Sequence, residues 1–184
     1  MITNLAWVLP RPNKSKYIGS FPLYFEDRLL DLLRIPKSAK ILHPFGGKAQ
    51  YGTRVDINPE TNPDIVGDAH NLVMIADNSY DLVILDPPYS DAYSERLYAT
   101  KGVKFKKYTA EAVRVCKEGG YIVMYHYLAT PPVSKTRLIK RIFIETRVWH
   151  KLRCVHIHIK DTNSWKGIRG QSIMDLSPLK RGME

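Results

Sequence analysis

The sequence predicts a single α/β domain with a mainly parallel sheet, and three observations carry this prediction. The chain has 184 residues, 44% of them hydrophobic, so it is long enough for one compact domain with its own core. Residues 82–85 form a continuous apolar run, which is typical of a strand covered on both faces. Strand-like runs also end at an acid, as at Asp56 and Asp86, where open α/β sheets bind their ligands.

The N-terminal region predicts an arm followed by a helix. Residues 1–20 include the basic, proline-spaced stretch 7–17, which predicts an extended docking arm outside the core. A helix is expected from Ser20 until Pro36 ends it. Its apolar residues recur at helical spacing: Phe25, Leu29, Leu32 and Leu33.

Three short strands follow, and the connections between them carry the polar groups. Residues 39–42 predict a strand, 43–47 a glycine turn, and the strand from Thr53 ends at Asp56. A third apolar unit within residues 64–72 again ends at an acid. Glycines let the backbone approach a ligand, and a carboxylate ending the second strand can accept two ribose hydroxyl bonds. This pattern favours a cofactor that contains a nucleoside.

The connections between these strands are unusually short. Ten residues, 43–52, separate the first two strands, and six, 59–64, separate the second from the third. Parallel strands usually need a crossover of about a dozen residues, so one or both helices should be missing. Part of one sheet face would then be bare unless residues 7–34, a second copy of the chain or another partner covers it.

The second half predicts a helix, a further strand and a C-terminal antiparallel hairpin. The helix spans 109–118 with Gly119 and Gly120 as its stop, and a strand follows at 121–125. A short basic helix is expected over 134–141. The last two of seven strands, 142–149 and 153–160, form the hairpin, and residues 161–184 are a loop-like tail of the single domain 1–184.

One face of the last strand carries Cys154, His156 and His158, because side chains alternate in a strand. Three such residues invite a metal hypothesis. Structural sites usually need a fourth ligand and sharper spacing, and no partner pair is visible, so no metal is predicted.

Five motifs in the same order resemble the Rossmann-like S-adenosylmethionine-dependent methyltransferases. They are Pro44-Phe45-Gly46-Gly47, Val55-Asp56-Ile57-Asn58-Pro59, Gly67-Asp68-Ala69, Tyr80-Asp81-Leu82-Val83 and Asp86-Pro87-Pro88-Tyr89. The last motif is similar to the subgroup that methylates exocyclic amino groups, best known from DNA adenine and cytosine methyltransferases. The resemblance covers roughly residues 14 to 160, and the ordered set is far more specific than any single motif.

The resemblance implies a role for each motif. Asp86, Pro87, Pro88 and Tyr89 would be catalytic and hold the target, and Asp86 would also lie against the cofactor. The remaining cofactor residues implied by the resemblance are Lys16, Tyr17, Pro44, Phe45, Gly46, Gly47, Asp56, Ile57, Asp68 and Ala69. Among these, Asp56 would hold the ribose and Asp68 would meet the adenine amino group.

Two departures from the family pattern stand at the first strand. His43 occupies a position where the family usually has an acid, and the turn reads Gly46-Gly47-Lys48-Ala49-Gln50 rather than a richer glycine pattern. A nicotinamide cofactor ranks low, because the sequence has no Gly-x-Gly-x-x-Gly run and the crossovers are equally short for that fold.

The net charge of +10 is unevenly distributed along the chain. Residues 1–40 carry +4, residues 41–100 carry −6 and residues 101–184 carry +12. An acidic middle between basic flanks is typical of a polyanion binder with a separate small-molecule pocket, although a solvated basic surface fits the charge equally well. Lysines interleaved with aromatics suit phosphates and stacked bases, namely Lys101, Lys104, Lys106 and Lys107.

Together these features predict an N-methyltransferase that acts on an exocyclic amino group of a nucleic-acid base, most simply adenine in DNA. The amine would be oriented by Asp86 and the carbonyl of Pro87, and Tyr89 would stack on the base. A guanine or adenine amino group in RNA, a protein amide, and an inactive nucleic-acid-binding module of the same fold remain as alternatives. The chain has no room for a separate target-recognition region, so any site preference would be short or supplied by a partner.

Two cysteines are too few for a disulfide framework, which favours a reducing compartment. No basic leader precedes the first apolar residues, and no apolar run reaches the roughly 20 residues of a membrane span. We therefore expect a cytoplasmic protein that does not enter membranes.

Overall fold

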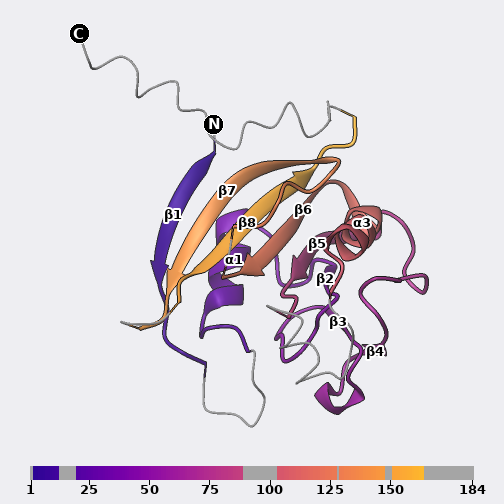
Figure 1. Cartoon of the computed structure of the whole chain (residues 1–184), viewed down its shortest axis with the longest axis horizontal. Helices are drawn as coiled ribbons and strands as arrows, with labels where there is room; N and C mark the ends of the chain where they lie inside the picture. The colour runs from indigo at the N-terminus through magenta and orange to yellow at the C-terminus, as the bar shows by residue number, and fades with distance from the viewer. Residues whose placement is uncertain (1, 13–19, 89–102, 128, 148–150, 164–184) are drawn as a thin grey trace.

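A computed structural model shows one eight-stranded sheet with helices against it (Figure 1). It describes residues 2–12, 20–88, 103–127, 129–147 and 151–163. The strands are β1 Thr3–Val8, β2 Ile41–His43, β3 Thr53–Asp56, β4 Ile65–Val66, β5 Tyr80–Leu85, β6 Cys116–His126, β7 Thr136–Glu145 and β8 Arg153–Lys160. The helices are α1 Phe25–Leu33, the 3-10 turn η1 Pro59–Thr61 and α3 Phe105–Val115.

The sheet has the strand order β1-β7-β8-β6-β5-β2-β3-β4. Strands β2 to β6 run parallel to one another, and β8 lies antiparallel between β6 and β7. This confirms the predicted α/β fold, with its mainly parallel sheet and its C-terminal antiparallel hairpin. The carboxyl ends of β2 to β6 consequently share one edge of the sheet.

The N-terminal arm is the first correction. Residues 3–8 form an eighth strand that pairs in parallel with β7, with Leu5 opposite Ile142. Leu9 continues the contact, because it is buried and its amide donates to the Glu145 carbonyl over 2.9 Å. The nearby prolines predict a loop, but the strand forms by pairing with a sheet edge more than 130 residues away.

The second correction is the basic helix expected over 134–141. These residues belong largely to β7, which begins at Thr136 after a left-handed residue, Lys135, with φ of 59°. Nearly the whole of β7 is paired with β8, so ladder hydrogen bonds override the local helical signal. The preceding helix also differs, since α3 ends at Val115 and the chain passes directly into β6.

The shortened crossovers are confirmed. All residues between β2 and β4 are described, and they contain turns and η1 but no α-helix. The connection from β4 to β5, residues 67–79, has none either. The sheet therefore carries few helices in its first half.

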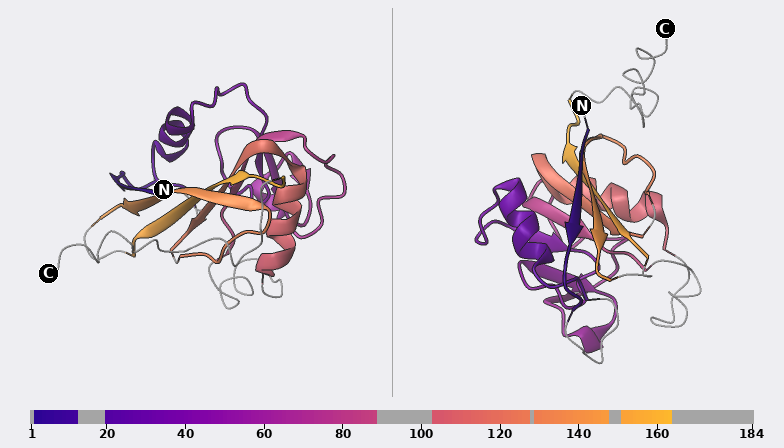
Figure 2. Two further views of the ribbon diagram at one scale, coloured as in Figure 1. Left: turned by 90° about the horizontal axis from the view of Figure 1, so that it is seen from above. Right: turned by 90° about the vertical axis from the view of Figure 1, so that its left-hand side faces the viewer.

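Both faces of the sheet are nevertheless covered. On one face α1 packs with Leu9 and partly buried Trp7 against Leu82 and Ile84, and on the other α3 packs against Val83 and Leu85. Figure 2 shows the two helices on opposite sides of the sheet. Because both faces of the sheet are covered at β5, residues 82–85 are all apolar and do not alternate with polar residues. Of the alternatives considered for this face, the described residues show cover by the N-terminal segment.

No helix in the ranges that the structure describes is long and apolar enough to cross a membrane.

Candidate functional site

The carboxyl edge of β5 carries the first candidate residues. Asp86 follows the strand directly and is half-buried, Pro87 is buried, and Pro88 is half-buried. Leu85 lies opposite Met124 of β6, so Tyr125 reaches the same edge. Burial raises the pKa of the Tyr125 phenol above its usual range, and the Asp86 carboxylate raises it further. The Asp86 carboxylate therefore lies close enough to the end of β6 to affect the pKa of Tyr125.

Close packing explains the glycines of the turn after β2. A Cβ on Gly46 would lie 2.6 Å from the Cβ of Arg54, which is closer than Cβ atoms approach in real proteins. The backbone amide of Gly46 donates to the Val55 carbonyl over 2.7 Å. Gly47 has φ of 47°, in the left-handed region that favours glycine. Beside them the ring of Phe45 lies edge-on to Tyr108 of α3, with 5.3 Å between centroids. The turn is therefore held flat against β3.

The turn's geometry depends on Asp56, which ends β3 and is buried. Its Oδ2 accepts the Gly47 amide over 2.9 Å, and its Oδ1 accepts the Asn58 amide over 2.9 Å. Each carboxylate oxygen has a second lone pair for another donor. Ile57, the next residue, is 45% exposed and lies at the same strand end.

The end of β4 brings together Asp68, Ala69 and a residue that the sequence analysis did not single out, His70. The Asp68 carboxylate accepts from the His70 backbone amide over 2.9 Å and lies 2.6 Å from its Nδ1. On the other side of the ring, Nε2 accepts the Lys104 amide over 2.9 Å. Because Nε2 accepts a hydrogen bond, the proton shared with Asp68 lies on Nδ1. The Asp-x-His spacing is the only local signal of this role.

The electrostatics of Asp68 follow from these contacts. Burial acts to raise the pKa of its carboxyl, but the two hydrogen bonds from His70 and the charge of Lys107 outweigh it and hold the pKa below the usual range. Asp68 is therefore an ionised acceptor near neutral pH.

Predicted nucleic-acid-binding lysines gather at the beginning of α3. Lys104 is its N-cap residue, and Lys106 and Lys107 lie in its first turn, all three exposed. A helix N-terminus already carries a partial positive charge, so three lysines there repel it and one another. An anionic partner would relieve this repulsion.

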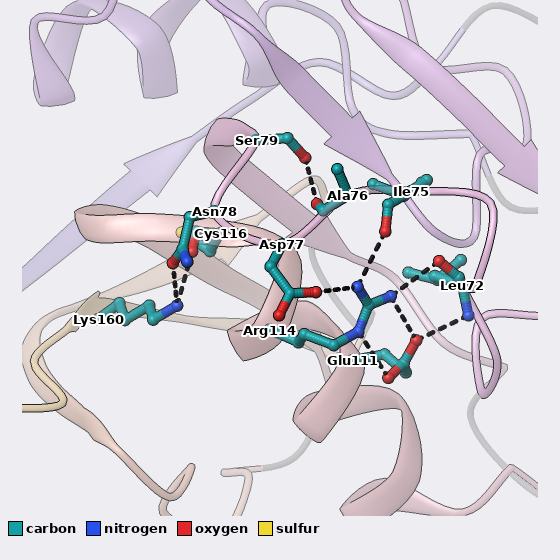
Figure 3. A network of polar contacts seen from close by, with 10 residues as sticks. All are labelled: Leu72, Ile75, Ala76, Asp77, Asn78, Ser79, Glu111, Arg114, Cys116 and Lys160. Atoms are coloured by element: carbon teal, nitrogen blue, oxygen red, sulfur yellow. Dashed lines mark hydrogen bonds and ion pairs between the residues drawn. The ribbon is translucent and has the colours of Figure 1, made fainter.

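The loop after Asp68 is fixed by α3 rather than by a helix of its own. As Figure 3 shows, the Arg114 guanidinium points into this loop. It donates to the carbonyls of Leu72 over 2.8 Å and Ile75 over 2.9 Å, and pairs with Asp77 and Glu111. Glu111 accepts the Leu72 amide over 2.7 Å, and its bond from Arg114 holds its pKa below the usual range.

Cys154, His156 and His158 lie inside the molecule. Cys154 Sγ is 3.4 Å from His156 Nε2, and the two imidazoles bond through Nδ1 to Thr130 and Thr136. Burial lowers the pKa of His156 to about 4 and that of His158 to about 3, so both are neutral. Within the part of the chain that the structure describes, no three His, Cys, Asp or Glu side chains form a group able to hold a metal.

Four predicted site residues lie outside the described residues, namely Lys16, Tyr17, Tyr89 and Lys101. The others fall on the ends of β2, β3, β4 and β5 or at the start of α3. The sheet order places these strand ends next to one another.

Comparison with known proteins adds the fold family. No family model and no curated protein matches the sequence. TrmN from Thermus thermophilus matches with a TM-score of 0.55 at 16% identity, over 77% of this chain and 50% of that one. A putative methyltransferase, YhhF from Escherichia coli, matches with a TM-score of 0.50 at 12% identity, over 84% of this chain and 92% of that one.

A third match comes from a methyltransferase with its cofactor product bound. It is the 1,6-didemethyltoxoflavin-N1-methyltransferase of Burkholderia thailandensis with S-adenosylhomocysteine, with a TM-score of 0.53 at 11% identity, over 74% of this chain and 76% of that one. The protein thus has the Rossmann-like methyltransferase fold, as the motifs predict. It spans half the length of the Thermus chain, and the identities are those of a shared fold.

Proposed function

We propose that this protein is an S-adenosylmethionine-dependent N-methyltransferase that modifies an exocyclic amino group of a nucleic-acid base. One observation carries the proposal. The order β4-β3-β2-β5 places Asp68, Asp56, the glycine turn and Asp86 side by side along one edge. This is the order of adenine, ribose, methionine and target in an extended cofactor with its acceptor. Three strand spacings of about 4.8 Å span roughly 14 Å, enough for an extended nucleoside.

The cofactor would be held by groups that are already fixed. Asp56 keeps a lone pair on each oxygen for the ribose hydroxyls, and Asp68 is ionised for the adenine amine. The exposed side chain of Ile57 offers an apolar surface to the base. Pro44, Phe45, Gly46 and Gly47 form the turn beside the methionine portion. The bound S-adenosylhomocysteine of the Burkholderia enzyme supports this use of the fold.

Transfer requires an amine whose lone pair is directed at the methyl group. The cofactor's sulfonium supplies the methyl group and the leaving group. An exocyclic amine is a poor nucleophile because its lone pair is delocalised into the ring, so its two NH groups must be held out of that geometry. Asp86 and the Pro87 carbonyl would accept them, and Tyr89 would stack on the base. A target within a duplex would first be flipped out of the stack.

The nucleic-acid assignment rests on charge and position. Lys104, Lys106 and Lys107 stand at the positive end of α3 next to Asp68, so phosphates would bind beside the cofactor site. DNA adenine is the favoured target, because the Asp86-Pro87-Pro88-Tyr89 motif resembles enzymes of that class.

The experiment is transfer of labelled methyl groups from S-adenosylmethionine to panels of DNA, RNA and protein, followed by digestion to the modified unit. We expect N6-methyladenine or N4-methylcytosine from DNA. A methylated guanine or adenine amine from RNA would change the proposed substrate from DNA to RNA and leave the proposed mechanism unchanged. A methylated protein amide would refute the nucleic-acid assignment, and a methylated oxygen or carbon atom would refute the proposed chemistry.

A second candidate is a nucleic-acid-binding module of this fold without activity. The altered turn and the missing acid at His43 favour it. Such a module would bind nucleic acid in a salt-dependent way and show no measurable affinity for S-adenosylhomocysteine. Calorimetry with this ligand distinguishes the two candidates.

A further inference from the structure

A buried glutamate on α1 stands behind the glycine turn. Glu26 is 5% exposed and lies among the apolar residues of the helix face that packs on the sheet. Burying a carboxylate is costly unless hydrogen bonds compensate it. Here the Gln50 amide compensates it, at 3.1 Å from Oε1 and 3.0 Å from Oε2. The acid therefore holds the far end of the turn that begins at Gly46.

The same carboxylate faces the position where the family's acid is missing. His43 is 1% exposed, and its Nε2 is 3.6 Å from Glu26 Oε1. In the described part of the chain this nitrogen has no hydrogen-bond partner. Burial lowers the pKa of His43 to about 4, so the imidazole is neutral and leaves the carboxylate to the backbone amide. A neutral histidine at this position therefore allows a carboxylate from another element, Glu26 of α1, to be buried beside it.

The next residue of α1 holds the next residue of the turn. The Tyr51 hydroxyl donates to Asp27 over 2.7 Å, and Lys37 lies 2.6 Å from both groups. Two consecutive acids of α1 thus bind two consecutive residues, one inside the protein and one at its surface. Asp27 provides a natural control for Glu26.

We propose that Glu26 is a positioning residue for methyl transfer: its carboxylate fixes the turn at residues 46–50 for the methionine portion of the cofactor, in place of the acid absent at residue 43. The inference rests on the proposed cofactor site. It extends the site to α1, in which Glu26 lies 24 residues before Gln50 in the sequence. The alternative is that Glu26 only ties α1 to the sheet and has no effect on the ligand.

Glu26→Gln is the first test, because it is isosteric and resembles the protonated acid. Burial raises the pKa of Glu26 to about 7, opposed by the amides of Gln50 and Tyr51, so the wild-type side chain is ionised at pH 8. At that pH we expect S-adenosylhomocysteine to bind the variant roughly tenfold more weakly, the scale of one charge-assisted hydrogen bond. KM for S-adenosylmethionine should rise while kcat changes little.

The charged groups around the pair allow a pH arm. Asp27 faces Glu26 from α1, and Arg54 faces His43 from β3. Because the pKa of His43 is lowered to about 4, His43 stays neutral between pH 6 and pH 8. The pKa of Asp27 is held below its usual range by Lys37 and Tyr51. The affinity difference between wild type and Glu26→Gln should therefore shrink at pH 6, where Glu26 is protonated.

Two further variants separate positioning from structure. Asp27→Asn should leave the affinity within about threefold, because its bond to Tyr51 lies at the surface. The exchange Glu26→His with His43→Glu returns the acid to the strand end and should recover most of the lost affinity. Melting curves check that each variant folds.

The outcomes are distinct. Wild type that fails to bind S-adenosylhomocysteine would remove the proposed cofactor site and this inference with it. Wild type that binds, together with a folded Glu26→Gln variant that binds equally well at pH 8, would overturn the inference alone. A folded exchange variant that stays as weak as Glu26→Gln would overturn the substitution for the missing acid.

Discussion

At the scale of single residues, Asp56 serves two purposes at once. Its carboxylate holds the amides of Gly47 and Asn58, and it is the proposed ribose acceptor. Both purposes require two carboxyl oxygens that accept hydrogen bonds at the end of β3. A single substitution should therefore affect the ligand and the fold together.

Asp56→Ala should weaken S-adenosylhomocysteine binding at least tenfold, because two ribose bonds and the support of the turn are lost. It should also lower the unfolding free energy by about 1–3 kcal/mol, since one buried and one part-buried amide lose their acceptor. Calorimetry and thermal unfolding measure the two effects. The sequence alone predicts an intact fold, and the bonds to Gly47 and Asn58 add the stability cost.

Asp64→Ala is the matched control. Asp64 accepts the amide of Arg54 in β3 over 2.8 Å, but it is exposed and reaches the turn only indirectly, through the Arg54 side chain. Its loss should leave the affinity unchanged. If Asp56→Ala bound the ligand as tightly as this control, the ribose role would be refuted.

The positions of candidate residues were predictable where they follow a strand end along the chain. Asp56, Asp68 and Asp86 could be placed because a short apolar run precedes each of them. The roles of Glu26 and His70 could not, because their partners Gln50 and Lys104 are 24 and 34 residues away. Only the packing of α1 and α3 brings them together.

At the scale of elements, side chains of α3 hold a loop that has no helix of its own. The loop from β4 to β5 has no helix, yet Arg114 binds two of its carbonyls and Glu111 binds one of its amides. Since Asp68 begins this loop, the helix positions the adenine end of the proposed site.

Arg114→Ala should reduce stability by about 1–3 kcal/mol, because two carbonyls and two carboxylates lose their donor. The affinity for S-adenosylhomocysteine should fall by a smaller factor than in Asp56→Ala. Urea unfolding and calorimetry measure both. Arg114→Lys keeps the charge without the planar fork and should lie between wild type and Ala. Wild-type stability of the alanine variant would contradict this role.

Elements differ in how much of them the sequence encodes locally. The strand over residues 82–85 was predictable because all four of these residues are apolar, which is typical of a strand covered on both faces. Strand β1 and the first half of β7 were not, because Thr3–Val8 and Thr136–Arg141 are strands through pairing with distant partners. Prolines near β1 locally predict a loop, and the basic residues in the first half of β7 locally predict a helix.

At the scale of the whole molecule, the N-terminal segment substitutes for absent crossover helices. Trp7, Leu9 and α1 cover the face of the sheet that contains Leu82 and Ile84. A second copy of the chain is not needed to cover this face. The N-terminal segment is therefore part of the core.

Deleting residues 1–12 should lower the melting temperature and promote self-association, because it uncovers apolar side chains and leaves β7 as an open edge. Thermal unfolding and size-exclusion chromatography measure the two effects. Substituting only exposed Thr3 with Ala is the control and should change neither. A truncated monomer that melts like wild type would refute the structural role of this segment.

The central claim is that Asp86 orients an amine for methylation, and Asp86→Ala tests it most directly. Methyl transfer to the nucleic-acid substrate and S-adenosylhomocysteine affinity are measured on the same preparation. We predict a loss of transfer on the order of 100-fold or more, with affinity within a few-fold of wild type, and a milder loss in Asp86→Asn, which keeps one acceptor oxygen. Full turnover by folded Asp86→Ala would contradict the claim.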